Sequence, residues 1–171
     1  MKLIEGMKKL KDLSRKAEDM RGKISVNCAH LSVETPTYGD KQREQVREWL
    51  QAHEDISKEM LRLRMAIQRT NLATSVSIEL GGKGVTKTIT EWIHRRRDLA
   101  KLDADAWSKL GDKGLKEGFG KNSLGEQIEV RIVRNFDPKE RDAKIELYRS
   151  EPMTIDATLE VTNAITDLIE S

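Results

Sequence analysis

The feature that most constrains the fold is a heptad repeat between residues 46 and 70. Mostly apolar side chains recur there at alternating intervals of three and four, at Val46, Trp49, His53, Ile56, Met60, Leu63, Ile67 and Thr70. Charged and amide side chains fill most of the positions between them. This pattern is typical of a coiled-coil helix, whose narrow apolar stripe needs partner helices to cover it. The first seven of these residues, Val46 to Ile67, are therefore the predicted seam of an oligomer.

A second repeat predicts a helix at the N-terminal end of the chain. Apolar residues lie seven apart at Leu3, Leu10, Ala17 and Ile24. Residues 2–26 should therefore form an amphipathic helix. Residues 27–40 break the period, and a second helix should run from Asp40, as its N-cap, to Asn71. The two long helices lie antiparallel if this connector folds back.

Residues 76–110 change from strand to helix signals. Apolar and polar residues alternate around the glycines at positions 81–84, which predicts a short β-hairpin. Thr88 and Glu91 match a capping box, so a third helix should begin at Thr88 and run to about Leu110.

The last third of the chain predicts a loop, a second hairpin and a helix. Residues 111–125 hold five of the eleven glycines and should form a loop. Residues 128–132 alternate and are expected to pair with Ile145 and Leu147 in a longer hairpin. Pro152 should end that hairpin, and a final helix is expected from about Asp156.

Together these elements predict a mainly α fold of the α+β class. Its core would be a long antiparallel coiled-coil helical hairpin in residues 1–73. Residues 74–171 would add a β-hairpin, a helix, the glycine-rich loop, a second β-hairpin and the C-terminal helix, all in one continuous unit. The strands are of the antiparallel type, and no βαβ crossover is evident.

Composition narrows the function classes. Charged residues make up 35% of the 171 residues, and aromatic residues only 4%, which suggests a thin core and a stripe buried between chains. Lys and Arg exceed Asp and Glu by only two, so the net charge indicates neither nucleic acid nor an anionic membrane as a partner. No run of apolar residues approaches the ~18 that a membrane-spanning helix needs, so no segment is expected to cross a bilayer. The expected location is the cytoplasm, or a virion into which the protein is assembled.

The residues that carry chemistry do not form a recognisable catalytic or metal motif. The Gly-Lys pairs at 82–83 and 120–121 lack the other residues of a phosphate-binding loop. Cys28 and His30 could belong to a metal site or a thiol–imidazole pair, and His53 could set register or form a histidine ring in an oligomer. We therefore expect no enzyme, no cofactor, no metal and no catalytic residue.

The basic triplet Arg95, Arg96 and Arg97 is the alternative functional signal. Together with lysines near the N-terminus it could bind phosphates in a nucleic-acid-associated helical module. Asp98 follows the triplet directly, and the aromatic residues that stack on single strands are not interleaved with it. A solvated helix face is the favoured interpretation.

The segment Ile67-Gln68-Arg69-Thr70-Asn71 resembles the close of the second helix in the septicolysin-like family of small bacterial coiled-coil proteins. Residues 155–159 and Thr162-Asn163 match the place where that family has its last helix. The resemblance follows the order of elements over most of the chain. It implies a helical coiled-coil fold, but no catalytic residues, because the family has no established activity.

The sequence thus favours a non-enzymatic structural or assembly protein that forms a homo-oligomer through its helices. Such a protein would suit an accessory component of a larger particle, such as a phage virion. Its partners would be further copies of itself and other structural proteins of the particle. Its hairpins could add strands to a neighbour's sheet.

Overall fold

The computed structural model describes residues 1–170, and these divide into two compact units. The first unit contains residues 1–76, residues 88–90 and the chain from Leu159. The second contains residues 77–87 and 91–158. The protein is mostly helical, with two small two-stranded sheets, as expected for an α+β fold.

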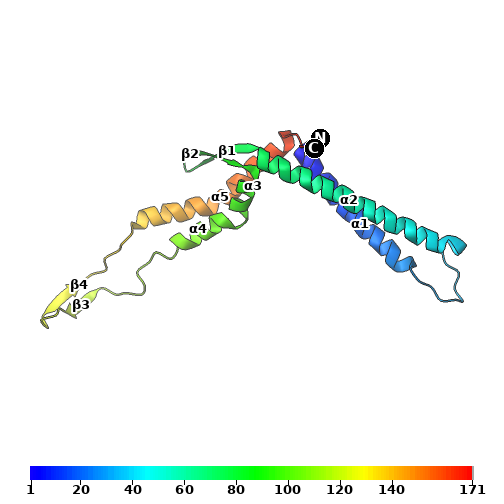
Figure 1. Ribbon diagram of the computed structural model, residues 1–171. Coiled ribbons are helices and arrows are strands. Elements are labelled where there is room, and N and C mark those ends of the chain that lie inside the picture. The colour runs from blue at the N-terminus through cyan, green and yellow to red at the C-terminus, as the bar shows by residue number, and fades with distance from the viewer. Residues whose placement is uncertain (171) are drawn as a thin grey trace. The chain divides into compact units, whose positions relative to one another are not determined.

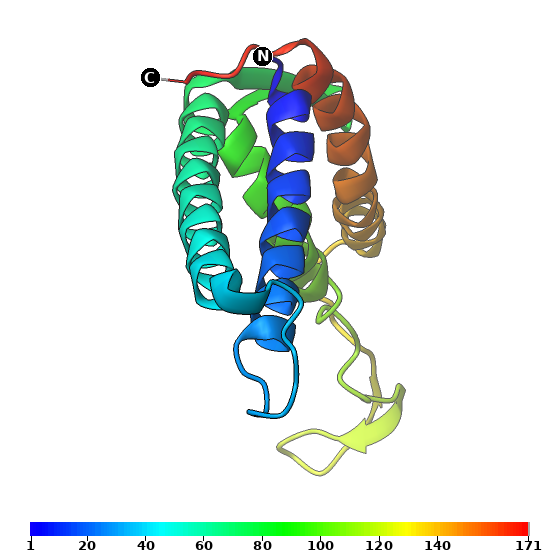
Figure 2. The same ribbon diagram turned by 90° about the vertical axis from the view of Figure 1, so that its right-hand side faces the viewer.

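Two long helices dominate the first unit. Helices α1 (Leu3–Asn27) and α2 (Gln42–Ala73) run side by side in opposite directions (Figure 1), as a second view confirms (Figure 2). Both predicted helices are therefore confirmed within about two residues. The predicted cap is wrong, because Asp40 lies in the 3-10 turn η1 (Gly39–Lys41) and α2 begins after Lys41 without a side-chain cap.

The connector between α1 and α2 is tied back onto both helices. The Gln42 side chain donates a hydrogen bond to the carbonyl of Asn27 (3.0 Å) and accepts one from the amide of Tyr38 (3.0 Å). The ring of Tyr38 meets the ring of Trp49 edge-on, with 5.5 Å between centroids. These contacts fix the turn that makes the helices antiparallel.

The C-terminal segment closes the other end of the helix pair. The amide of Leu3 donates to the carbonyl of Thr166 (2.9 Å), and the amide of Leu168 donates to the carbonyl of Met1 (2.8 Å). The amide of Ile169 donates to the hydroxyl of Thr70 (2.9 Å), which itself donates to a carbonyl one turn earlier in α2. Both ends of the chain are thus bound to the same end of the pair.

The chain after α2 follows the prediction as far as the third helix. Strands β1 (Ser75–Leu80) and β2 (Lys83–Thr88) pair across a two-residue turn. Gly81 and Gly82 have φ of 57° and 76°, the left-handed values that such a hairpin turn requires. Helix α3 (Ile89–His94) begins where the capping box predicted, and the helical run ends at Trp107 rather than Leu110.

The third helix contains one turn of π-helix. Segment η2 (Arg95–Leu99) joins α3 to α4 (Ala100–Trp107), and the amide of Ala100 donates to the carbonyl of Arg95, five residues back. A π turn inserts one extra residue and shifts the following side chains around the helix axis. This irregularity falls on the arginine triplet.

The predicted second hairpin and the start of the last helix are wrong. Strand β4 (Gln127–Val130) pairs with β3 (Gly118–Lys121), which lies inside the predicted glycine-rich loop. Residues 145 and 147 are in α5 (Pro138–Ile165), a single helix that includes Pro152. The structure therefore replaces a long-range strand pairing with a local hairpin and a longer helix.

Local chemistry explains both differences. The Asn122 side-chain oxygen accepts hydrogen bonds from the amides of Leu124 and Glu126 (3.0 Å each), and Gly125 adopts φ of 80°. These contacts build a tight turn between β3 and β4. At the start of α5, Asp137 Oδ1 accepts the amide of Lys139 (2.9 Å) and acts as an N-cap directly before Pro138.

Candidate functional site

The predicted seam lies on the face of α2 that meets α1, but it is unevenly buried. Leu63 is 2% exposed and Thr70 is fully buried, so this end of the stripe belongs to the core of the first unit. The other members are only half-buried, at Val46, Trp49, His53, Ile56, Met60 and Ile67. The seam is therefore fully buried only at Leu63 and Thr70 and partly covered at its other positions.

A second group of apolar side chains lies on a different face of α2. Leu50, Leu61 and Leu72 are spaced eleven residues apart, and Met65 lies on the same side by the helix period. All four are exposed, from 44% for Met65 to 63% for Leu61. Helix α2 thus presents uncovered apolar surface besides the partly covered seam.

Of the histidines and the cysteine that the sequence singled out, Cys28 and His30 lie together in the first unit and His53 lies apart from them. Cys28 and His30 line an open hollow of about 450 Å³ at the connector, beside Arg43 and Arg47. The Cys28 thiol is exposed and donates to the carbonyl of Ser25 (3.4 Å). His53 lies further along α2, where its Nε2 atom is 3.4 Å from the Arg21 guanidinium. Among residues 1–170 there is no group of three or more His, Cys, Asp or Glu that could hold a metal.

The arginine triplet is largely paired with carboxylates of its own unit. Arg95 makes a bidentate pair with Glu151 (2.7 Å for both bonds) and a further bond to Asp103 (2.6 Å). Arg96 donates to Asp156 (2.7 Å). Arg97 is the most exposed of the three and lies 3.5 Å from Asp98. The arrangement offers one loosely held guanidinium to a phosphate rather than three.

The pair formed by Arg95 and Glu151 is a structural element of the second unit. Glu151 is 3% exposed, and its hydrogen bonds raise the pKa of the Arg95 guanidinium above the usual value for arginine. The guanidinium also lies 5.8 Å from the ring centroid of Tyr148. A buried carboxylate needs such a partner, because an isolated buried charge is very costly. This pair therefore joins η2 to α5 and is unavailable for a ligand.

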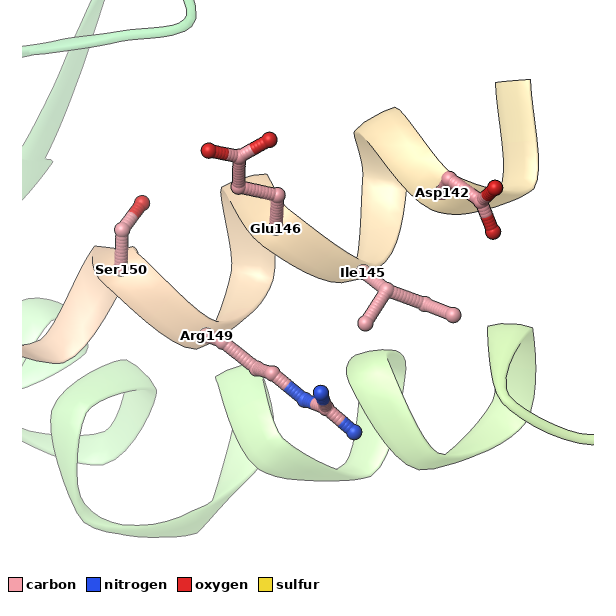
Figure 3. Close-up of a pocket in the computed structure, with 5 residues that line it drawn as sticks. All are labelled: Asp142, Ile145, Glu146, Arg149 and Ser150. Atoms are coloured by element: carbon pink, nitrogen blue, oxygen red, sulfur yellow. The ribbon is translucent and has the colours of Figure 1, made fainter. Parts of the chain in front are cut away.

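Helix α5 also borders a shallow hollow of about 620 Å³ (Figure 3). Its lining comes from one face of α5, at Asp142, Ile145, Glu146, Arg149 and Ser150. Figure 3 shows Ile145 and Arg149 pointing toward the neighbouring green helix, and Glu146 and Ser150 pointing away from it. The Ser150 hydroxyl in this lining donates to the carbonyl of Leu147 (2.9 Å) rather than to a carboxylate, so the hollow shows no hydrogen-bonded pair of nucleophile and base.

The described residues contain no helix that combines the length and the apolar character needed to cross a membrane.

The chain belongs to a protein family of unknown function, DUF6847, whose model matches residues 10–168. The match spans both units of the structure and nearly the whole chain. No curated protein is similar enough to match this sequence.

One solved structure shares the fold. It is the crystal structure of a functionally unknown conserved protein from Corynebacterium diphtheriae, which is 19% identical. The similarity covers 98% of each chain with a TM-score of 0.58. At this identity the likeness supports the fold alone, and membership of the septicolysin-like family stays a prediction.

Proposed function

We propose that this protein is a non-enzymatic structural or assembly protein that forms a homo-oligomer through the seam of α2. The observation that carries the proposal is the half-burial of the seam between Val46 and Met60 after α1 has packed. Apolar side chains left in this state gain free energy when another helix covers them, at roughly 25 cal/mol per Å² of apolar area buried. A coiled-coil arrangement of helices from several copies would complete that burial.

The distribution of apolar surface supports the same proposal. Among the described residues, more large apolar side chains are exposed than are buried. Scattered exposed side chains are normal, but several on one helix suggest an interaction surface. Here Leu50, Leu61, Met65 and Leu72 add to the seam on the same helix. A self-assembling building block of a larger particle, such as a phage virion, would use such surfaces.

The nucleic-acid alternative receives no support from a specific observation. Two of the three arginines on which it depends are held by carboxylates at 2.7 Å or less. A protein that binds phosphates would need to break these pairs or use other cations. We therefore propose assembly as the function and expect no salt-sensitive binding to generic DNA or RNA.

The mass in solution tests the proposal directly. Sedimentation at micromolar concentration should show a mass well above the 19.5 kDa of one chain. Ile56→Asp should lower that mass, because it places a carboxylate where apolar side chains meet. Ser57→Asp is the matched control, since Ser57 is the exposed neighbour of Ile56 on α2. A parent protein that sediments as a clean monomer would overturn the proposal.

A further inference from the structure

The hairpin formed by β3 and β4 is not paired with a further strand in the described residues. Its two strands form a sheet of their own in the described residues, and every residue of β4 is exposed. Figure 1 shows the hairpin at the end of two segments, one leaving α4 and one leading to α5. A lone two-stranded hairpin is marginally stable in water. It therefore gains most by pairing with another strand.

The register shows which backbone groups are free. The amide of Asn122 donates to the carbonyl of Glu126 (3.0 Å), so the backbone groups of these two residues point inward, toward the partner strand of the hairpin. Inward pairs recur every second residue, so Gly120 with Ile128 and Gly118 with Val130 also face inward. The backbone groups of Glu129 therefore point away from β3, as do those of Arg131 by continuation.

The residue after β4 supports the same assignment. The amide of Ile132 donates to the Glu117 carboxylate (3.2 Å), on the side of the incoming strand. An inward amide at Ile132 agrees with inward groups at Ile128 and Val130. The outer edge of β4 thus presents the amides and carbonyls of Glu129 and Arg131 to solvent.

The side chains along this edge are self-complementary. Glu129 and Arg131 form an exposed ion pair (3.2 Å) on one face of the strand. Ile128, Val130 and Ile132 alternate with them on the other face, and Val130 lies over Gly120, where an added Cβ would come within 2.8 Å of its side chain. An antiparallel copy centred on Val130 would place Glu129 opposite Arg131 twice, with Ile128 opposite Ile132.

We propose that the outer edge of β4 pairs antiparallel with the same edge of a second copy of this chain, with Val130 opposite Val130. The result is a four-stranded sheet in the order β3, β4, β4, β3. Opposite charges across an antiparallel pair stabilise it, and like charges destabilise it. The outer edge of β3 is the poorer choice, because Glu117, which would face Lys121 of a second copy, already accepts the amide of Ile132 on the side of β4.

This contact is small and rests on the proposed assembly. Two strands of four residues bury far less than the ~1,600 Å² of a standard protein interface. The contact therefore acts together with the helix seam, which raises the local concentration of the second hairpin. It also keeps the exposed strand edge from pairing with unrelated chains.

A single-cysteine cross-link tests the register. Val130 would form a non-hydrogen-bonded pair with its copy, with Cα atoms ~4.5 Å apart, within the range that a disulfide spans. Val130→Cys in a Cys28→Ser background should form a covalent dimer under a mild added oxidant. Leu124→Cys in the same background is the control. Leu124 is 81% exposed and Val130 is 42% exposed. If random collisions between chains determined the rate of cross-linking, the cysteine at position 124 would therefore link faster than the one at position 130.

Charge variants show whether the contact lies between chains. In the Val130→Cys background, Glu129→Arg alone and Arg131→Glu alone place like charges opposite each other, and cross-linking should slow about tenfold. A mixture of these two variants restores opposite charges only between chains, so mixed dimers should form at close to the parent rate. Failure of Val130→Cys to link, equal linking at Leu124→Cys, or no recovery in the mixture would overturn this pairing. Any of these results leaves the sedimentation test of the seam unaffected.

Discussion

The two ends of the α1–α2 pair differ in how completely they are buried. At the end where both chain termini lie, Leu3, Leu63 and Thr70 are shielded from water. Toward the connector the facing residues Trp49, His53 and Ile56 are half-buried. Both regions continue one heptad repeat, so the difference comes from what covers it. The C-terminal segment supplies Leu168 and several hydrogen bonds at the first end only.

The two ends of the α1–α2 pair should therefore contribute to different properties of the protein. Residues at the closed end, from Leu63 to Thr70, contribute to folding of the single chain. Residues at the open end, from Val46 to Met60, keep surface that a second chain can cover. Substitutions at the two ends should therefore change different measurements, even though the side chains are alike.

Aspartate at the two ends should have the largest and most different effects. Leu63→Asp places a carboxylate in a site that is 2% exposed, and we expect a loss of several kcal/mol in the free energy of unfolding. Ile56→Asp can keep its carboxylate hydrated, so the chain should remain folded while losing partners. Thermal melts followed by circular dichroism measure the loss of stability, and sedimentation measures the loss of assembly. Together they distinguish the effects of the two variants. Equal losses of Tm would contradict the comparison.

The glycines of α1 give a matched pair for packing. A Cβ at Gly6 would lie 3.1 Å from Leu168 Cδ2, whereas a Cβ at Gly22 meets nothing within 4 Å. We expect Gly6→Val to cost about 2 kcal/mol, because it forces Leu168 to move. Gly22→Val should be neutral or slightly stabilising, since glycine is a poor helix former. Urea unfolding of both variants measures the difference, and identical midpoints would show that the closed end is not tightly packed.

Thr70 provides a smaller effect at the same end. Thr70→Val keeps the shape of the side chain but removes the oxygen that accepts the Ile169 amide at 2.9 Å. A fully buried amide left without its partner costs about 1–3 kcal/mol, and the cost here should lie at or below the lower end because this bond is only partly buried. Hydrogen exchange at Ile169 should become faster in Thr70→Val and change little in Thr70→Ser. Unchanged protection in the valine variant would mean that this bond does not hold the C-terminal segment.

The sequence predicted the helix pair well because its signal is local and repeated. Leu3 to Ile24 and Val46 to Thr70 carry the heptad over several turns, and each repeat supports the same helix. The uneven burial of the seam could not be predicted, because it depends on the C-terminal segment about a hundred residues later. The seam could be predicted from its heptad, whereas the free edge of β4 could not, because the alternation at residues 128–132 was compatible with more than one partner strand.

The predicted start of the last helix is wrong because α5 continues across Pro152. Asp137, Pro138 and Glu140 supply the N-cap, the first-turn proline and the third-position glutamate of a helix start, and this is the sequence signal for the beginning of α5. Helical spacing continues from Ile145 through Tyr148 to Ile155 across the proline. A proline removes one hydrogen bond of a helix, and packing of the buried Ile155 and Glu151 compensates for it here.

The smallest predicted effect is a pH dependence between the two ends, at Glu59. This carboxylate accepts hydrogen bonds from Arg62 (2.9 Å) and from Lys9 of α1 (2.8 Å), and together they lower its pKa to about 2. Because the pKa is lower in the folded chain, the stabilisation is present above the usual carboxyl pKa near 4.5 and is lost as the pH falls toward 2. The side chain is 29% exposed, so the effect should be modest and weaker at 1 M salt. Unfolding midpoints measured from pH 5 to pH 2 should fall more steeply for the parent than for Glu59→Gln, whose side chain cannot titrate. Parallel curves would show that the link between Lys9 and Glu59 adds nothing to the pairing of α1 with α2.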